Sequence, residues 1–119
     1  MSIWEMIINE LHNAQIEAYP PATKVGECTR NYVVVKQDGS SQVGNFSSEF
    51  VYYHFMLYVP QNKYDTLDKY EAEVKEVLDT KLYPVLKPTA SKMPDYYDDE
   101  KRAHMRSFIY RNSVRNKHL

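Results

Sequence analysis

The first part of the chain has apolar residues at the spacing of an α-helix. They recur three and four positions apart and form one stripe: Ile3, Trp4, Ile7, Ile8 and Leu11. Ser2 followed by Glu5 is a capping-box pattern, in which each side chain satisfies a backbone N–H at the helix start. The spacing therefore predicts a helix over residues 2–15. Pro20 and Pro21 end any continuation because proline lacks the donor N–H, and we expect an ordered loop up to residue 30.

Two segments in the middle of the chain have the composition and alternation of β-strands. Residues 32–36 are a β-branched run, and Asp38-Gly39 after them predicts a tight turn because its central residues need positive φ. Residues 50–59 alternate, with one wholly apolar face. The other face carries Tyr52, His54, Met56 and Tyr58. We expect this second face to be covered by a helix or by another subunit.

A second helical pattern follows. Apolar residues at helical spacing run from Tyr64 to Leu82, and Glu71 and Lys75 are placed to pair across one turn. Pro84 and Pro88 then restrict the short piece between them to an edge strand or a loop.

The last third of the chain predicts a loop, a strand and a tail. Residues 94–100 are acidic and tyrosine-containing and form an exposed loop, after which alternation resumes over residues 103–111. Residues 113–119 are a basic tail that we expect to be flexible. The whole order predicts one α+β domain over residues 1–112: a small, mainly antiparallel or mixed β-sheet with two α-helices packed on one face.

Charge and targeting signals exclude several classes of protein. Fifteen Lys and Arg stand against sixteen Asp and Glu, so the chain has no global basic surface of the kind that drives nonspecific DNA binding. No apolar run approaches the length of a membrane span, and the N-terminus has no secretory signal pattern. The sequence therefore predicts a protein made and kept in the cytosol.

Candidate chemistry is sparse. Only three glycines are present, and none forms a phosphate-binding loop. The single Cys28 could pair with His54 or His104 as a nucleophile, but a structural thiol is favoured. The acidic loop lacks calcium-loop spacing, and the histidines lack metal-ligand spacing. We therefore predict no enzyme activity and no catalytic, cofactor-binding or metal site.

Two surfaces remain as candidate binding sites. Basic residues gather near the C-terminus around Tyr110, and Arg106, Arg111 and Arg115 are candidates for a lumen or a DNA-facing surface, with a solubilising tail as the alternative. Tyrosine, with eleven copies, suits half-exposed interfaces. The candidate interface residues are Tyr52, His54, Tyr58, Tyr96, Tyr97, Asp98 and Asp99. Core packing is the alternative for these tyrosines.

Several segments together resemble a known family of phage proteins. They are Tyr19-Pro20-Pro21-Ala22-Thr23-Lys24, Tyr32-Val33-Val34-Val35-Lys36 with Asp38-Gly39, Tyr58-Val59-Pro60, Leu82-Tyr83-Pro84 and Tyr96-Tyr97-Asp98-Asp99. This set is similar to the tail completion or tail terminator proteins of long-tailed bacteriophages and prophages. The resemblance covers most of the chain from residue 19 to residue 112.

The resemblance implies a structural role. Members of this family are α+β subunits that form a homo-oligomeric ring, usually hexameric, at the head-proximal end of the tail tube. The ring ends tube polymerisation and docks to the head–tail connector, and DNA passes through it. The implied partners are the tail tube protein and connector proteins, and the implied location is the virion neck after assembly in the host cytoplasm. A head–tail stopper or adaptor, or a small soluble binding module, are the alternatives.

Overall fold

The computed structural model describes residues 2–43 and 48–115, with side chains for residues 2–39 and 50–112. The helices are α1 (Ile3–Asn13), a 3₁₀ segment η1 (Gln61–Thr66), α2 (Leu67–Val77) and a π-helical segment η2 (Leu78–Leu82). The strands are β1 (Ala18–Tyr19), β2 (Tyr32–Val43), β3 (Ser48–Pro60), β4 (Lys87–Lys92), β5 (Tyr96–Asp98) and β6 (Ala103–Arg115).

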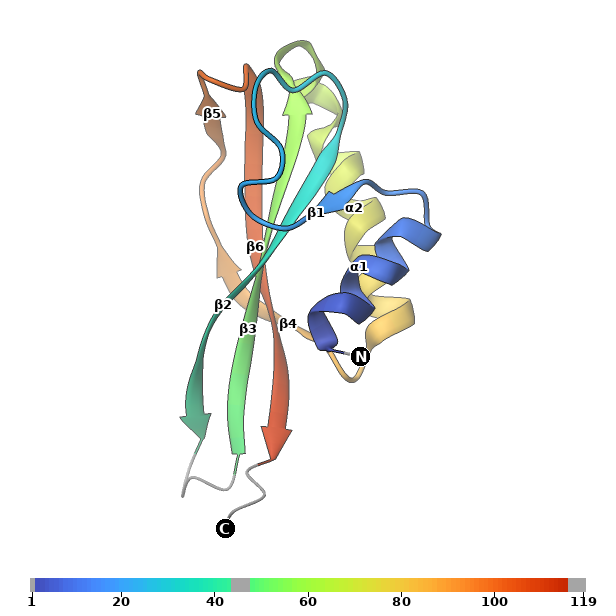
Figure 1. Cartoon of the computed structure of the whole chain (residues 1–119), viewed down its shortest axis with the longest axis vertical. Coiled ribbons are helices and arrows are strands. Elements are labelled where there is room, and N and C mark those ends of the chain that lie inside the picture. The colour runs from blue at the N-terminus through green and yellow to red at the C-terminus, as the bar shows by residue number, and fades with distance from the viewer. Residues whose placement is uncertain (1, 44–47, 116–119) are drawn as a thin grey trace.

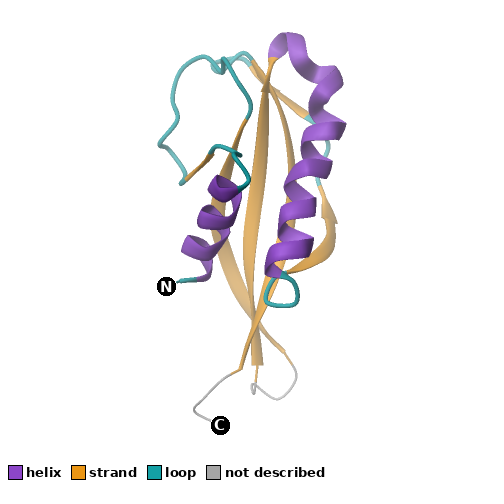
Figure 2. Ribbon diagram, turned by 90° about the vertical axis from the view of Figure 1, so that its right-hand side faces the viewer, coloured by secondary structure: helices purple, strands orange, loops and turns teal. Residues whose placement is uncertain are grey.

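The strands form one mixed sheet with the order β1-β2-β3-β6-β4, and β5 pairs with the other end of β6. Only β1 runs parallel to its neighbour among these described strands, and β2, β3 and β6 form a long antiparallel centre. Both helices lie on one face of the sheet (Figures 1 and 2). The predicted α+β class, with two helices on one face of a mixed sheet, is therefore confirmed.

The alternation of β3 explains how the sheet holds the helices. Its odd-numbered side chains from Tyr53 to Val59 are buried and join α1 and α2 in the main core. α1 contributes Ile7 and Leu11, which are fully buried, and α2 contributes Val74. Because successive strand residues point to opposite faces, the even-numbered residues of β3 must face away from the helices.

The loop between β1 and β2 covers the upper half of that second face. Cys28 from the loop packs with Tyr32, Val34, Tyr58 and Ala103 in a second buried cluster. In Figure 1 this loop crosses in front of the upper strands, while the lower parts of β2, β3 and β6 continue past the helices without such a cover. The molecule is accordingly long, with extents of 51 × 26 × 24 Å.

Several local predictions are confirmed and others are corrected. The Ser2–Glu5 capping box is present, and α1 and the α2 region lie where the periodicity places them. Asp38-Gly39 is wrong as a hairpin turn. The strand continues through it to Val43, and Gly39, with φ of 89°, sits at an irregularity in the pairing between Gln37 and Ser40. A glycine at a bulge uses the same positive φ that a turn would.

The strands of the last third also differ from the predicted pattern. The piece between Pro84 and Pro88 was predicted as an edge strand or a loop, and Val85 and Leu86 in it are irregular. The edge strand β4 begins only at Lys87 and continues through Pro88 to Lys92, beyond the predicted piece. The predicted acidic loop contains β5, which pairs with the start of β6. β6 itself continues to Arg115, which pairs with Ser48, so residues 113–115 belong to the sheet. The rest of the predicted tail, residues 116–119, lies outside the described residues.

Candidate subunit interface

An uncovered surface lies on the lower half of the sheet, on the side away from the helices. Residues directly opposite each other on neighbouring strands share one face. Tyr52 is opposite Arg111, and His54 is opposite both Ile109 and Lys36. We call this surface the open strand face, and it consists of Lys36, Phe50, Tyr52, His54, Ile109 and Arg111. Lys36 is exposed and the other five are half-buried.

The open strand face combines aromatic surface with positive charge. The Arg111 guanidinium lies 4.1 Å from the centroid of the Phe50 ring, and that ring meets the edge of Tyr52 with centroids 6.4 Å apart. A guanidinium over an aromatic ring is attracted by the ring's negative face. The Lys36 ammonium forms an ion pair of 3.5 Å with the Asp38 carboxylate.

His54 is the titratable group of this face. Its Nδ1 lies 3.8 Å from the Asp38 carboxylate, and its Nε2 is buried with no hydrogen-bond partner among the described residues. Burial lowers the pKa of His54, and the attraction of Asp38 only partly offsets this effect. The predicted interface residues Tyr52 and His54 therefore lie on the same face of β3, where Tyr52 is half-buried and the His54 side chain is 14% exposed.

Tyr58 was also expected on that surface, and this prediction is wrong. It is only 9% exposed and belongs to the second cluster, where its ring stacks on Tyr32 with centroids 5.0 Å apart. The Lys101 ammonium lies 5.6 Å from the same ring. Tyr58 is on the predicted face of β3, but the loop that contains Cys28 packs over this part of the face. Tyr58 is a core residue.

Three of the four candidate residues in the acidic tyrosine-containing loop are exposed and one is half-buried. Tyr96 is 58% exposed and Tyr97 38%, Asp99 is exposed, and Asp98 is half-buried. Tyr97 donates a hydrogen bond of 2.9 Å to Oε1 of Gln61, and Oδ1 of Asp98 accepts from two backbone N–H groups of the following turn. The loop lies at the end of the molecule opposite the last residues of β2 and the first residues of β3 (Figure 1). One subunit therefore does not bring this loop and the open strand face together.

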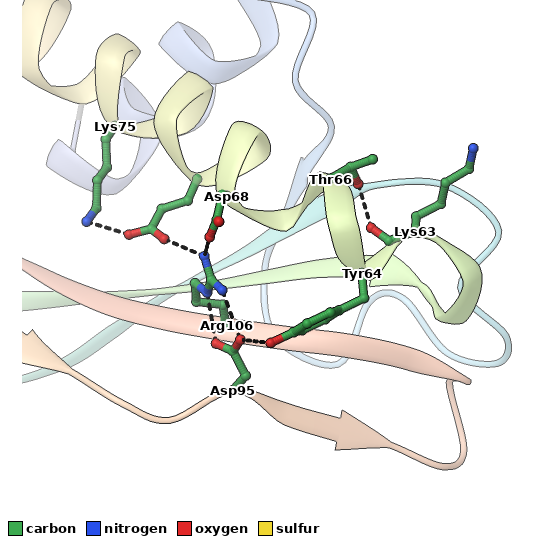
Figure 3. Close-up of polar contacts among 8 residues, drawn as sticks. Lys63, Tyr64, Thr66, Asp68, Lys75, Asp95 and Arg106 are labelled. Atoms are coloured by element: carbon green, nitrogen blue, oxygen red, sulfur yellow. Dashed lines mark hydrogen bonds and ion pairs between the residues drawn. The ribbon is translucent and has the colours of Figure 1, made fainter.

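Arg106 was expected to face a lumen or DNA, and this prediction is also wrong. Its side chain is 11% exposed and lies on the helix side of β6, where three carboxylates surround it (Figure 3). Those carboxylates are Asp68, Glu71 and Asp95. Hydrogen bonds to Asp95 are the largest cause of a raised pKa for Arg106, and they lower the pKa of Asp95 to about 2. Arg106 is a structural cation.

Of the other two predicted cations, Arg111 belongs to the open strand face, as described above. The backbone of Arg115 pairs with Ser48, and the side chain of Arg115 lies outside the described residues.

A second surface, which the sequence analysis missed, lies on the helix side. A groove of about 550 Å³ separates the C-terminal half of α1 from the second half of α2. Three carboxylates line it, Glu10, Glu73 and Glu76, against one ammonium, Lys81, and Ala14, Ile16 and Val77 supply apolar surface. Glu73 and Glu76 are exposed on α2, and no local pattern in the sequence shows that α1 lies beside them.

The described residues contain no group of three or more His, Cys, Asp and Glu side chains that could hold a metal ion. Cys28 is buried, and its thiol donates to the carbonyl of Arg30 at 3.2 Å. Burial raises the pKa of the Cys28 thiol, which disfavours the thiolate that a nucleophile needs. Within the described part of the chain, no helix is long and apolar enough to span a membrane.

Comparison with known proteins adds no family assignment. No model of a known protein family matches the chain, and no curated protein is significantly similar to it.

Proposed function

We propose that this protein is a structural subunit of a phage tail: a tail terminator, or tail completion protein. It would close into a homo-oligomeric ring at the head-proximal end of the tail tube, and such rings are usually hexameric in the family that the chain resembles. In this role the ring ends tube polymerisation and docks to the head–tail connector. The proposal starts from the segments between residues 19 and 112 that resemble this family.

The observation that carries the proposal is the open strand face. Phe50, Tyr52 and Ile109 form a half-exposed apolar surface on the central strands, and Arg111 adds a cation to it. Aromatic residues and arginine are the residue types enriched where subunits meet. A ring with more than two members needs two different patches on each subunit, and Tyr96 at the far end and the helix groove are further surfaces for such contacts.

Static light scattering coupled to size-exclusion chromatography tests the ring. The purified chain is expected to elute as a single species several times the 14.1 kDa mass of one chain, and negative-stain images should show a ring with a central hole. Added to polymerising tail tubes, it should bind one end of each tube and stop growth. A chain that stays monomeric at high concentration and leaves tube length unchanged would exclude this function.

Binding to separated tail tubes and to separated connectors distinguishes the neighbouring roles in a phage neck. A terminator is expected to bind tube ends in the absence of a connector. A stopper or adaptor would bind the connector and leave free tube ends uncovered, which would contradict the terminator role while keeping a role in the neck.

A further inference from the structure

The open strand face and the helix groove lie on opposite sides of the same sheet. Phe50, Tyr52 and Arg111 point away from the helices because Val51, Tyr53 and Asn112 occupy the alternate positions that point toward them. The groove is formed by the helices themselves. A contact between the open strand face of one copy and the helix groove of another therefore uses two different patches. Such a head-to-tail contact can be repeated from each copy to the next.

The open strand face has an excess of positive charge. Arg111 makes no ion pair with any described residue, and Lys87 lies beside it on the neighbouring strand, directly opposite in the pairing of β4 with β6. Lys36 adds a third cation, and Asp38 is the one described carboxylate that pairs on this face. The apolar rings between these cations give a surface that an acidic partner with some apolar area would fit.

The groove has the opposite character. Glu10, Glu73 and Glu76 form no ion pair with any described residue, so their charges are uncompensated within the described subunit apart from the single Lys81. Other carboxylates on the helix side are compensated, since Glu71 binds both Lys75 and Arg106. Val77 and Ile16 provide apolar surface within the same groove. The excess of three carboxylates over one ammonium complements Arg111 of the open strand face and Lys87 beside it, which form no ion pair with any described residue.

We propose that the open strand face of one copy of this chain docks into the α1–α2 groove of the next copy, with Arg111 placed against Glu73 and Glu76. The inference rests on the proposed function, because it names the partner of the surface on which that function depends. The lower strands project beyond the helices (Figure 1), which leaves this end of the sheet accessible to a neighbouring molecule. The contact is heterologous, as a closed ring requires.

A charge-swap experiment tests the pairing in the full-length chain. Arg111→Glu and Glu76→Lys are expected each to weaken self-association by at least about tenfold, because each places like charges across a contact. The double variant, which exchanges the two charges, should recover most of the lost association. Circular dichroism should match the unaltered protein, because Glu76 is exposed and Arg111 is half-buried outside both core clusters. Thermal melting of Arg111→Glu measures separately the loss of its contact with the Phe50 ring.

Two matched controls give the experiment its specificity. Asp65→Lys makes the same change of charge at an exposed site outside the groove and should leave association unchanged. Asp99→Lys alters the acidic tyrosine-containing loop. If Asp99→Lys, and not Glu76→Lys, weakened association and rescued Arg111→Glu, the loop would be the partner and the groove assignment would be overturned.

The outcomes also separate this inference from the proposed function. If the unaltered chain forms rings and the groove variants do so equally well, the pairing is wrong and the ring role stands. If the unaltered chain forms no assembly alone or on tail tubes, the proposed function fails first and the docking inference fails with it. Loss in both single variants and recovery in the double variant supports the inference.

Discussion

Arg106 and Asp95 form a bidentate ion pair that joins strand β6 to the loop before β5. Nε of Arg106 donates to Oδ1 of Asp95 at 2.8 Å, and Nη2 donates to Oδ2 at 2.9 Å. Tyr64 donates its hydroxyl to the same carboxylate at 2.7 Å, and Glu71 accepts from Nη1 of Arg106 at 2.9 Å (Figure 3). This geometry joins β6, the loop before β5, η1 and α2. Parallel hydrogen bonds between guanidinium and carboxylate are among the strongest polar contacts in proteins.

Replacing Asp95 with asparagine should destabilise the fold and change its acid sensitivity. The pKa of Asp95 falls from 3.8 to about 2 on folding, and because this residue is exposed, solvent screening limits the stabilisation by its ionised form to about 1 kcal/mol. That contribution is complete above about pH 4 and is lost as the pH falls toward 2, because the unfolded chain then binds more protons. Urea unfolding between pH 2 and pH 6 should show a weaker pH dependence for Asp95→Asn. The exposed Asp99→Asn is the control, and an equal change in both variants would contradict the argument.

The two classes of tyrosine should respond differently to truncation. Tyr58→Ala removes a buried ring that stacks on Tyr32, and a loss of roughly 3–5 kcal/mol in the free energy of unfolding is expected for such a cavity. Tyr96→Ala alters a side chain that is 58% exposed and should change the free energy of unfolding by less than about 0.5 kcal/mol. Chemical denaturation measures both. Equal losses would show that Tyr96 is a core residue in solution.

His54 should make the stability of the protein fall in mildly acidic solution. Burial holds the pKa of His54 below its ordinary value of 6.5, so the unfolded chain binds a proton that the folded chain refuses. Between the two pKa values the free energy of unfolding therefore decreases as the pH falls. His54→Gln should remove this slope below about pH 6.5. NMR titration of the ring protons gives the folded pKa directly, and a value above 6.5 would reverse the expected sign.

The sequence predicted the elements whose pattern is local and missed the features that depend on contacts between distant segments. The alternation of residues 50–59 predicted β3 and its two faces, and the Ser2–Glu5 pair predicted the start of α1. The pattern within β3 does not show that the loop between β1 and β2 covers Tyr58 and does not reach Tyr52. This difference depends on where Cys28 packs. The short strand β1 was missed because two residues carry no periodicity and because its pairing with Val33 and Val34 depends on a distant segment.

The charged residues give the same lesson about candidate sites. Arg106 and Arg111 are five positions apart on one strand, so an odd spacing places them on opposite faces of the sheet. The sequence-based prediction grouped Arg106 and Arg111 by charge and did not place them on opposite faces. Arg106 meets three carboxylates on the helix side, and Arg111 meets an aromatic ring on the open side. Alternation counted from the register of β6 would have separated them, but the register itself depends on the fold.

The thiol of Cys28 should react slowly in the folded protein, which tests the alternative of a cysteine nucleophile. The side chain is 5% exposed, and burial raises its pKa above the ordinary value, so little thiolate is present and reagents have little access to it. Labelling with a chromogenic disulfide at pH 7.5 should be at least about a hundredfold slower than in urea. Because the chain has one cysteine, the signal is unambiguous, and Cys28→Ser gives the blank. Labelling as fast as in the unfolded chain would contradict the buried thiol and return Cys28 to the list of candidate nucleophiles.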